Sequence, residues 1–167
     1  AITVRCWTFG QTAWPASSRV ATSKLTEECV SVMMAFDLDG VLIPDCDDLP
    51  NVGGVDEFYE VAYAMRPMFQ PPLGSALITG RHARYEHMTQ SWMLRHLDPL
   101  PRLFHSRQPD QAPQEYKLAV LNANPSIRLY VESDLDQALF IDKNTVTGCK
   151  VVQFDGWLQA LLAREIT

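Results

Sequence analysis

Two aspartates that lie two residues apart carry the clearest chemical signal in this sequence. Asp37 and Asp39 stand in the run FDLDG, directly after the apolar stretch 30–36. In a parallel α/β sheet, ligands bind beyond the carboxyl ends of the strands, so both acids can face one site. The first carboxylate could attack phosphorus, while the second protonates the leaving oxygen and then activates water. Gly40 would let the chain turn back tightly behind them.

Exposed acids in a loop are the commoner meaning of such a pattern, and on these two residues alone both interpretations stay open. Further polar residues follow later strands. Thr79 stands in LITGR after the apolar stretch 75–78, Lys117 stands in EYK, and Glu132 and Asp134 stand in ESD after LYV. With the first two acids, this order resembles the haloacid dehalogenase-like hydrolase superfamily over residues 30–154.

The resemblance implies a role for each position. Asp37 would be the nucleophile that forms an aspartyl-phosphate, and Asp39 the general acid and base. Thr79 would donate its hydroxyl to the transferring phosphoryl group, and Lys117 would neutralise charge on Asp37 and on phosphate. Such cations and donors are needed because a dianionic phosphate is otherwise repelled by a carboxylate.

The resemblance also implies Mg²⁺, held by the Asp37 carboxylate, the Asp39 backbone carbonyl and an acid after the fourth strand. Ser133 separates Glu132 from Asp134, a departure from the usual acid pair, so the two stand jointly as the expected ligand. Asp136 is a third candidate, although an acid in the first turn of a helix is the commoner meaning of its position.

The substrate side of the expected site includes Thr79, Gly80, Arg81 and Lys117. Each has a simpler alternative that stays open. Thr79 and Gly80 could be a strand-to-turn transition, Arg81 a surface residue that starts a helix, and Lys117 a solvated helix residue.

Within the superfamily, an Asp at the second position is typical of phosphatases, so Asp39 favours hydrolysis of a phosphomonoester. The stretches 40–75 and 81–117 are too short for a folded cap domain, which predicts a nearly capless site. The expected substrate is a phosphorylated small molecule such as a nucleotide or phosphometabolite, or a polynucleotide 3'-phosphate end. The alternative is a degenerate or receiver-like Mg²⁺-binding interaction domain without catalysis.

Apolar runs alternate with stretches of helical spacing, which predicts an α/β fold: a Rossmann-like parallel sheet of about five strands flanked by helices, with a minimal cap. The expected strands are 30–36, 75–78, 103–105, 127–131 and 150–154. The expected helices are 55–69, 85–96, 115–121 and one that starts at 137–141.

The chain of 167 residues has the length of one domain. Residues 1–32 read as an extension of uncertain structure and 33–167 as the hydrolase domain. The net charge of −6 argues against tight binding of duplex nucleic acid. No apolar run approaches the roughly 20 residues of a membrane span, and no secretory signal pattern opens the chain, so we expect a cytoplasmic protein with no membrane contact. The four scattered cysteines and four histidines indicate neither zinc nor disulfides.

Overall fold

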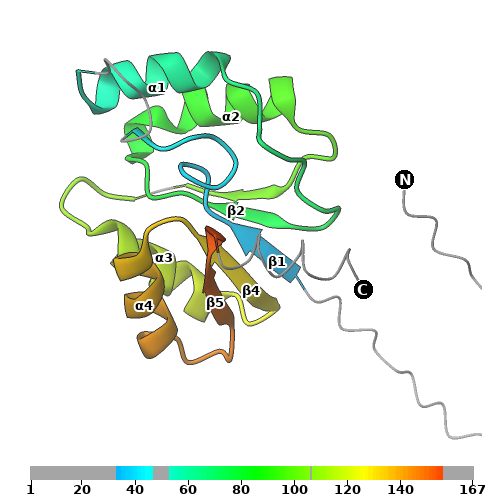
Figure 1. The fold of residues 1–167 in the computed structure, drawn as a ribbon. Helices are drawn as coiled ribbons and strands as arrows, with labels where there is room; N and C mark the ends of the chain where they lie inside the picture. Colours follow the sequence, from blue (N-terminus) through cyan, green and yellow to red (C-terminus); the bar gives the residue numbers. More distant parts are fainter. Residues whose placement is uncertain (1–32, 47–52, 106, 156–167) are drawn as a thin grey trace, which may run out of the picture.

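The computed structural model describes residues 33–46, 53–105 and 107–155. Strands and helices alternate along these ranges (Figure 1): β1 (Met33–Phe36), α1 (Val55–Ala64), β2 (Ala76–Ile78), the short 3-10 helix η2 (Ala83–Tyr85), α2 (Glu86–His96), β3 (Arg102–Phe104), α3 (Pro113–Ala123), β4 (Ile127–Glu132), α4 (Leu135–Asn144) and β5 (Lys150–Gln153). The expected extension 1–32 and the first three residues of the expected strand 30–36 lie outside the described residues.

The five strands form one parallel sheet in the order β3-β2-β1-β4-β5. Phe36, the last residue of β1, lies opposite Leu77 on one side and Val131 on the other. The chain builds outward from β1 to β3 and then returns to the other side of β1 with β4. This reversal creates a crevice at the carboxyl ends of β1 and β4, where open α/β sheets bind ligands. The predicted Rossmann-like α/β fold is confirmed.

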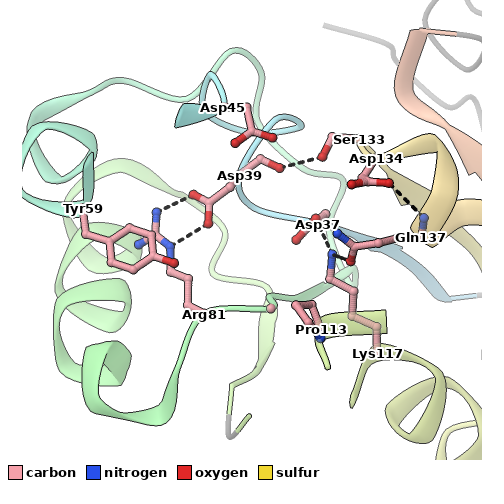
Figure 2. A pocket seen from close by; sticks show the side chains of 11 residues that line it. Asp37, Asp39, Asp45, Tyr59, Arg81, Pro113, Lys117, Ser133, Asp134 and Gln137 are labelled. Carbon is pink, nitrogen blue, oxygen red and sulfur yellow. Dashed lines mark hydrogen bonds and ion pairs between the residues drawn. The ribbon is translucent and has the colours of Figure 1, made fainter. Parts of the chain in front are cut away.

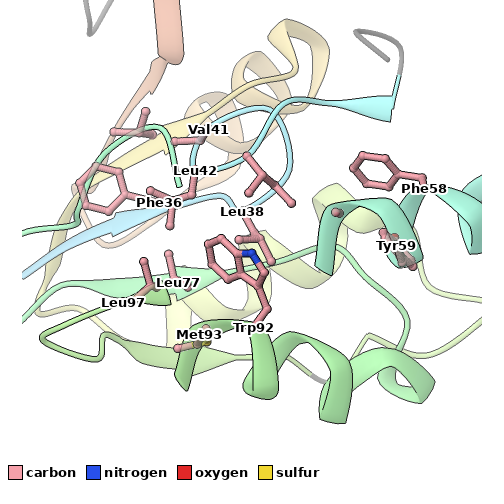
Figure 3. Packing of buried hydrophobic residues seen from close by; sticks show 13 residues of the cluster. Phe36, Leu38, Val41, Leu42, Phe58, Tyr59, Leu77, Trp92, Met93 and Leu97 are labelled. Atoms are coloured by element: carbon pink, nitrogen blue, oxygen red, sulfur yellow. The ribbon is translucent and has the colours of Figure 1, made fainter. Parts of the chain in front are cut away.

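Helices cover both faces of the sheet, with α1 and α2 on one face and α3 and α4 on the other (Figure 1). The alternation of side chains along each strand divides the core in two. Phe36 and Val131 belong to the cluster under α1 and α2, whereas their neighbours Ala35 and Tyr130 belong to the cluster under α3 and α4. Figure 3 shows the first cluster, in which Trp92 and Met93 of α2 pack toward the sheet. Burial on both faces explains why the strands read as continuous apolar runs.

The first helix is shorter than the sequence predicted. The expected helix 55–69 ends at Ala64, and Met65 is already extended, with φ −72° and ψ 144°. Pro67 prevents the helix from continuing to residue 69, because proline lacks an N–H and disfavours a helical conformation in Arg66, the residue before it. Where they fall in the described residues, the predicted strands begin and end within two residues of the observed strands. The remaining predicted helices begin within two residues of the observed helices.

The chain leaves α1 along a path that ties the first connection to the body of the fold. Met68 donates its N–H to the carbonyl of Leu42 at 2.8 Å. The Trp92 indole donates to the carbonyl of Met65 at 2.9 Å. Within the described residues, each connection between strands holds one α-helix, preceded by the short η2 in the connection from β2 to β3, and no further folded unit. None of the helices described has the length and apolar character needed to cross a membrane.

Candidate functional site

The predicted site residues gather at the carboxyl edge of the sheet. Asp37 follows β1 and continues its ladder, donating its N–H to the carbonyl of Val131 at 2.9 Å. Thr79 follows β2, Glu132 is the last residue of β4, and Lys117 reaches in from the middle of α3. Residues from four separate parts of the chain therefore meet at the crevice that the strand order creates.

Lys117 is the centre of a buried ion-pair network, which we call the lysine cluster: Asp37, Lys117, Tyr130, Glu132 and Gln137. The Lys117 ammonium lies 2.6 Å from Asp37 Oδ2, 2.8 Å from Glu132 Oε2 and 3.0 Å from Gln137 Oε1. The Tyr130 hydroxyl donates to Glu132 Oε2 at 2.8 Å. Only 2% of Lys117 is exposed, so the alternative of a solvated helix residue is wrong.

The lysine cluster contains two carboxylates and one ammonium, and their pKa values follow from that imbalance. Burial and the neighbouring Glu132 raise the pKa of Asp37 well above its usual range, and Lys117 opposes this only in part. Burial alone would raise the pKa of Glu132, but Lys117 and the hydrogen bonds to this carboxylate lower it. Burial alone would lower the pKa of Lys117, but the two carboxylates raise it above its usual value. The cluster thus favours a further positive charge beside Asp37.

Glu132 is fully buried, and hydrogen bonds occupy both of its oxygens. Its Oε2 accepts from Lys117 and Tyr130, while its Oε1 accepts from the backbone N–H groups of Ser133 at 3.1 Å and Asp134 at 3.3 Å. This carboxylate orients Lys117 and accepts the backbone N–H groups of the two residues that follow β4. Because each of its oxygens accepts two hydrogen bonds, Glu132 does not suit the role of metal ligand that the resemblance implied for it jointly with Asp134.

A second network, the arginine cluster, consists of Asp39, Tyr59, Arg81 and Thr89. Arg81 holds Asp39 in a bidentate pair, with Nε to Oδ2 at 2.9 Å and Nη2 to Oδ1 at 2.5 Å. Its Nη1 donates to Thr89 Oγ1 at 3.3 Å, and its guanidinium carbon lies 4.3 Å from the centre of the Tyr59 ring. Because only 3% of Arg81 is exposed, the alternative of a surface arginine is wrong.

The loops that follow β1 and β4 approach each other closely. Gly40 has φ +76°, and a Cβ on this residue would lie 2.4 Å from the Cβ of Ser133. The Ser133 hydroxyl donates to the backbone carbonyl of Asp39 at 3.0 Å. The tight turn expected of Gly40 is present, and it allows the two loops to touch.

An open cavity of about 160 Å³ separates the two clusters (Figure 2). Its lining residues are Asp37, Asp39, Asp45, Tyr59, Gly80, Arg81, Pro113, Lys117, Ser133, Asp134 and Gln137. Thr79, which the sequence assigned to the phosphoryl group, is fully buried and does not line it. The Thr79 hydroxyl accepts the Arg81 N–H at 3.2 Å, so it shapes the turn that presents Gly80 and Arg81.

Several lining residues were not assigned to the site from the sequence. Tyr59 has the helical spacing of a core residue, and no sequence signal separates its aromatic ring from its neighbours. Gln137 stands three residues after Asp134, and Asp134 Oδ1 accepts its N–H at 2.9 Å as the cap of α4. That cap spacing was readable in the sequence. Asp45 belongs to the acidic stretch after the first strand, and that concentration of carboxylates was a second feature of the sequence that could have pointed to the site.

The lining residues offer oxygen donors but not a preformed metal site. Among the described residues, no group of three or more His, Cys, Asp or Glu side chains is arranged to hold a metal ion. The lining carboxylates of Asp37, Asp39, Asp45 and Asp134 outnumber the cations Arg81 and Lys117 by four to two, which leaves two negative charges. A hard cation with oxygen ligands, such as Mg²⁺, fits this donor set, with water or substrate supplying further ligands.

Comparison with known proteins found no matching family model, no matching curated protein and no matching solved structure. The function must therefore be inferred from the geometry and chemistry of the site.

Proposed function

We propose that this protein is a Mg²⁺-dependent phosphomonoester hydrolase that uses Asp37 as its nucleophile. The observation that carries the proposal is the buried Lys117, whose ammonium pairs with the Asp37 carboxylate at an open cavity. A carboxylate can attack a phosphate dianion only where cations offset their repulsion, and Lys117 supplies one at the attacking group. The order of motifs that resembles the haloacid dehalogenase-like hydrolases supports the same function.

The surroundings of Asp37 suit in-line attack on phosphorus. Asp37 Oδ2 accepts from Lys117 at 2.6 Å and Oδ1 accepts the N–H of Leu38 at 2.8 Å, so the carboxylate is fixed in direction. Attack forms a bond between an Asp37 oxygen and phosphorus and breaks the bond from phosphorus to the ester oxygen. Fixing the nucleophile in advance lowers the entropic cost of reaching that geometry.

Asp39 would complete the proton transfers. The Asp39 carboxylate takes up a proton from solvent and passes it to the leaving ester oxygen, which departs as an alcohol. Asp39 then takes a proton from the water that attacks phosphorus, and the bond to Asp37 breaks to release inorganic phosphate. Asp39 returns this second proton to solvent, so each turnover consumes one water and leaves both aspartates as carboxylates.

Mg²⁺ would be held by the Asp37 carboxylate, the Asp39 backbone carbonyl and the Asp134 carboxylate. Asp134 is favoured over Glu132 because each Glu132 oxygen already accepts two hydrogen bonds, whereas Asp134 Oδ1 accepts one, from the Gln137 N–H. Asp136 is exposed in the first turn of α4 and does not line the cavity. When bound, the ion would neutralise phosphate charge and offset the excess of carboxylates over cations in the cavity lining.

The size of the cavity bears on the substrate. Pockets that enclose a small-molecule ligand have volumes of roughly 300–1,000 Å³, whereas this cavity measures about 160 Å³. It therefore suits the phosphoryl group, and the leaving group would lie largely outside. A nucleotide, a small phosphometabolite and a polynucleotide 3'-phosphate end all meet that requirement.

The test is phosphate release from p-nitrophenyl phosphate and from a panel of nucleotides, sugar phosphates and 3'-phosphorylated oligonucleotides. We expect activity that requires Mg²⁺, disappears in EDTA and is lost in Asp37→Asn. The exposed Asp110 in the loop after β3 provides a matched control, and Asp110→Asn should keep full activity.

Full activity in Asp37→Asn would disprove the nucleophile assignment. If the unmodified chain released no phosphate from any substrate, a non-catalytic or receiver-like domain would become the better interpretation. A stable acyl phosphate on Asp37 after incubation with acetyl phosphate would then identify the receiver-like alternative.

A further inference from the structure

The arginine cluster holds Asp39 in a position that conflicts with its proposed role. Both carboxylate oxygens of Asp39 accept hydrogen bonds from the Arg81 guanidinium. Figure 2 shows this carboxylate directed toward Arg81, on the opposite side of the cavity from Lys117. A carboxylate engaged in this way must release at least one of these bonds before it can pass a proton to a leaving oxygen.

Arg81 is the less mobile partner of the pair. Its guanidinium is also held by the Thr89 hydroxyl and by the face of the Tyr59 ring, and only 3% of its side chain is exposed. The Asp39 side chain is 19% exposed and stands in the loop beyond β1. Separation of the pair would therefore move Asp39 and leave the guanidinium in place, facing the cavity that it lines.

A guanidinium fork binds phosphate oxygens with the same bidentate geometry that it uses for a carboxylate. A phosphomonoester dianion carries twice the charge of a carboxylate, so it competes well for Arg81. We propose that substrate phosphate displaces Asp39 from Arg81, which makes Arg81 a phosphate-binding residue and frees Asp39 only when substrate is present. This inference rests on the proposed function, because it concerns the same cavity and gives Asp39 the same role.

The exchange favours one class of ligand. A phosphomonoester keeps three unesterified oxygens, so two can engage Arg81 while the group still faces Asp37. A phosphodiester has only two such oxygens and one negative charge, which gives it no electrostatic advantage over the Asp39 carboxylate. The pair thus selects for terminal phosphate groups over internal phosphodiester linkages.

The experiment measures the affinity of the full chain for inorganic phosphate by calorimetry at saturating Mg²⁺. Four proteins are compared: the unmodified chain, Asp39→Asn, Arg81→Met and the double variant. Asp39→Asn should tighten phosphate binding by about tenfold, since Arg81 no longer has to give up a charged partner. In the Arg81→Met background the same substitution should leave the affinity nearly unchanged.

A matched control separates this exchange from a general change in charge. Arg84 lies three residues further along the chain, but it is 66% exposed and pairs with Asp56. Arg84→Met removes the same charge, yet it should preserve the tightening caused by Asp39→Asn. Equal tightening with and without Arg81 would mean that Asp39 merely repels phosphate, and it would overturn the proposal. Weaker or unchanged binding in Asp39→Asn would show that the pair is only structural.

Arg81 is buried, so Arg81→Met could fail to fold. In that case the Nε–H resonance of Arg81 in the unmodified chain provides the test. It should shift during titration with inorganic phosphate and should not shift with an equal ionic strength of chloride; a resonance indifferent to phosphate would overturn the exchange. Neither measurement involves turnover. If phosphate binding depends on the Arg81–Asp39 pair as described but the chain hydrolyses no phosphomonoester, the proposed function alone is refuted. If the chain hydrolyses phosphomonoesters but phosphate binding does not depend on this pair, the present inference alone is refuted.

Discussion

The lysine and arginine clusters border the same cavity, yet they hold their charges in different ways. In the lysine cluster, the Lys117, Asp37 and Glu132 side chains are exposed by 3%, 6% and 0%. In the arginine cluster, Asp39 is 19% exposed and accepts both guanidinium bonds from one partner. The first cluster keeps its charges away from solvent, whereas the second has one member, Asp39, that we propose a ligand displaces.

The supporting elements explain this difference. The lysine cluster draws on α3, β4 and α4 and on Asp37, which follows β1 and continues its ladder, so its members are fixed by the sheet and by two packed helices. In the arginine cluster, Asp39 stands in a loop. Only Arg81 is anchored, by the Tyr59 ring of α1 and the Thr89 hydroxyl of α2. Groups on strands and packed helices keep their geometry better than groups on loops. The following predictions test this contrast in order of decreasing effect on stability.

Lys117→Met should cause the largest loss of stability. It leaves the carboxylates of Asp37 and Glu132 buried without a cation, and breaking a buried pair in this way costs about 3–5 kcal/mol. Urea unfolding of the full chain measures the loss. The exposed Lys150 of β5 offers the control, and Lys150→Met should change stability by less than about 0.5 kcal/mol. Similar losses in both variants would mean that the lysine cluster is not a special source of stability.

Tyr130→Phe should have a smaller effect on the same cluster. The variant removes one hydrogen bond to Glu132 Oε2, which still accepts from Lys117. A buried bond to a charged group contributes about 1.5–3 kcal/mol. The comparison is with Tyr63→Phe, because the half-buried Tyr63 accepts its hydroxyl bond from the exposed Arg95. If both phenylalanine variants unfold at the same urea concentration as the unmodified chain, the Tyr130 hydroxyl does not support the cluster.

Asp39→Asn should separate stability from activity. Arg81 is buried, but asparagine can still accept one of its two bonds, so the loss of stability should be about 1 kcal/mol, the net contribution of one hydrogen bond. Turnover should fall by roughly 10²–10⁴-fold, since the general acid and base is lost. The fall should be greater for an alkyl phosphate than for p-nitrophenyl phosphate, whose leaving group needs less protonation. An equal fall for both substrates would argue against proton donation by Asp39.

Arg84→Met should have the smallest effect. Arg84 and Asp56 form an ion pair with 66% and 74% of their side chains exposed. Such pairs contribute about 0–1 kcal/mol and are screened by salt. Thermal unfolding at low and high salt concentration should show little difference between Arg84→Met and the unmodified chain. A loss well above about 1 kcal/mol would show that burial does not rank these pairs as the comparison requires.

Much of the site's location could be predicted from the sequence. The alternation of apolar runs with helical spacing requires a parallel sheet, and parallel strands bring their carboxyl ends to one edge. Asp37, Thr79 and Glu132 end or follow three such strands, so their approach to one another was predictable. The early end of the first helix was also within reach, because Pro67 falls inside the predicted range 55–69.

The partners of each charge could not be predicted in the same way. Tyr59 reads as a core position of an amphipathic helix, yet its ring covers Arg81 at the cavity. In the sequence, Glu132 and Asp134 are two carboxylates at the end of the fourth strand with nothing to distinguish their roles. In the structure, the backbone N–H groups beyond β4 bond to Glu132, and Asp134 caps α4. These roles depend on side-chain directions that no short motif specifies.

The sequence by itself determined the α/β architecture and the edge of the sheet at which the acids gather, because periodicity and strand ends are local properties of the chain. The resemblance implied that Lys117 neutralises Asp37, whereas only the tertiary structure decided that Glu132 also pairs with Lys117 and that Arg81 holds Asp39. Lys117 meets Asp37 across 80 residues of sequence, and Arg81 meets Asp39 across 42. Pairs so far apart are set by how the helices pack on the sheet, and that packing decided that Asp37 has a buried, permanent partner while Asp39 has one that a ligand can take.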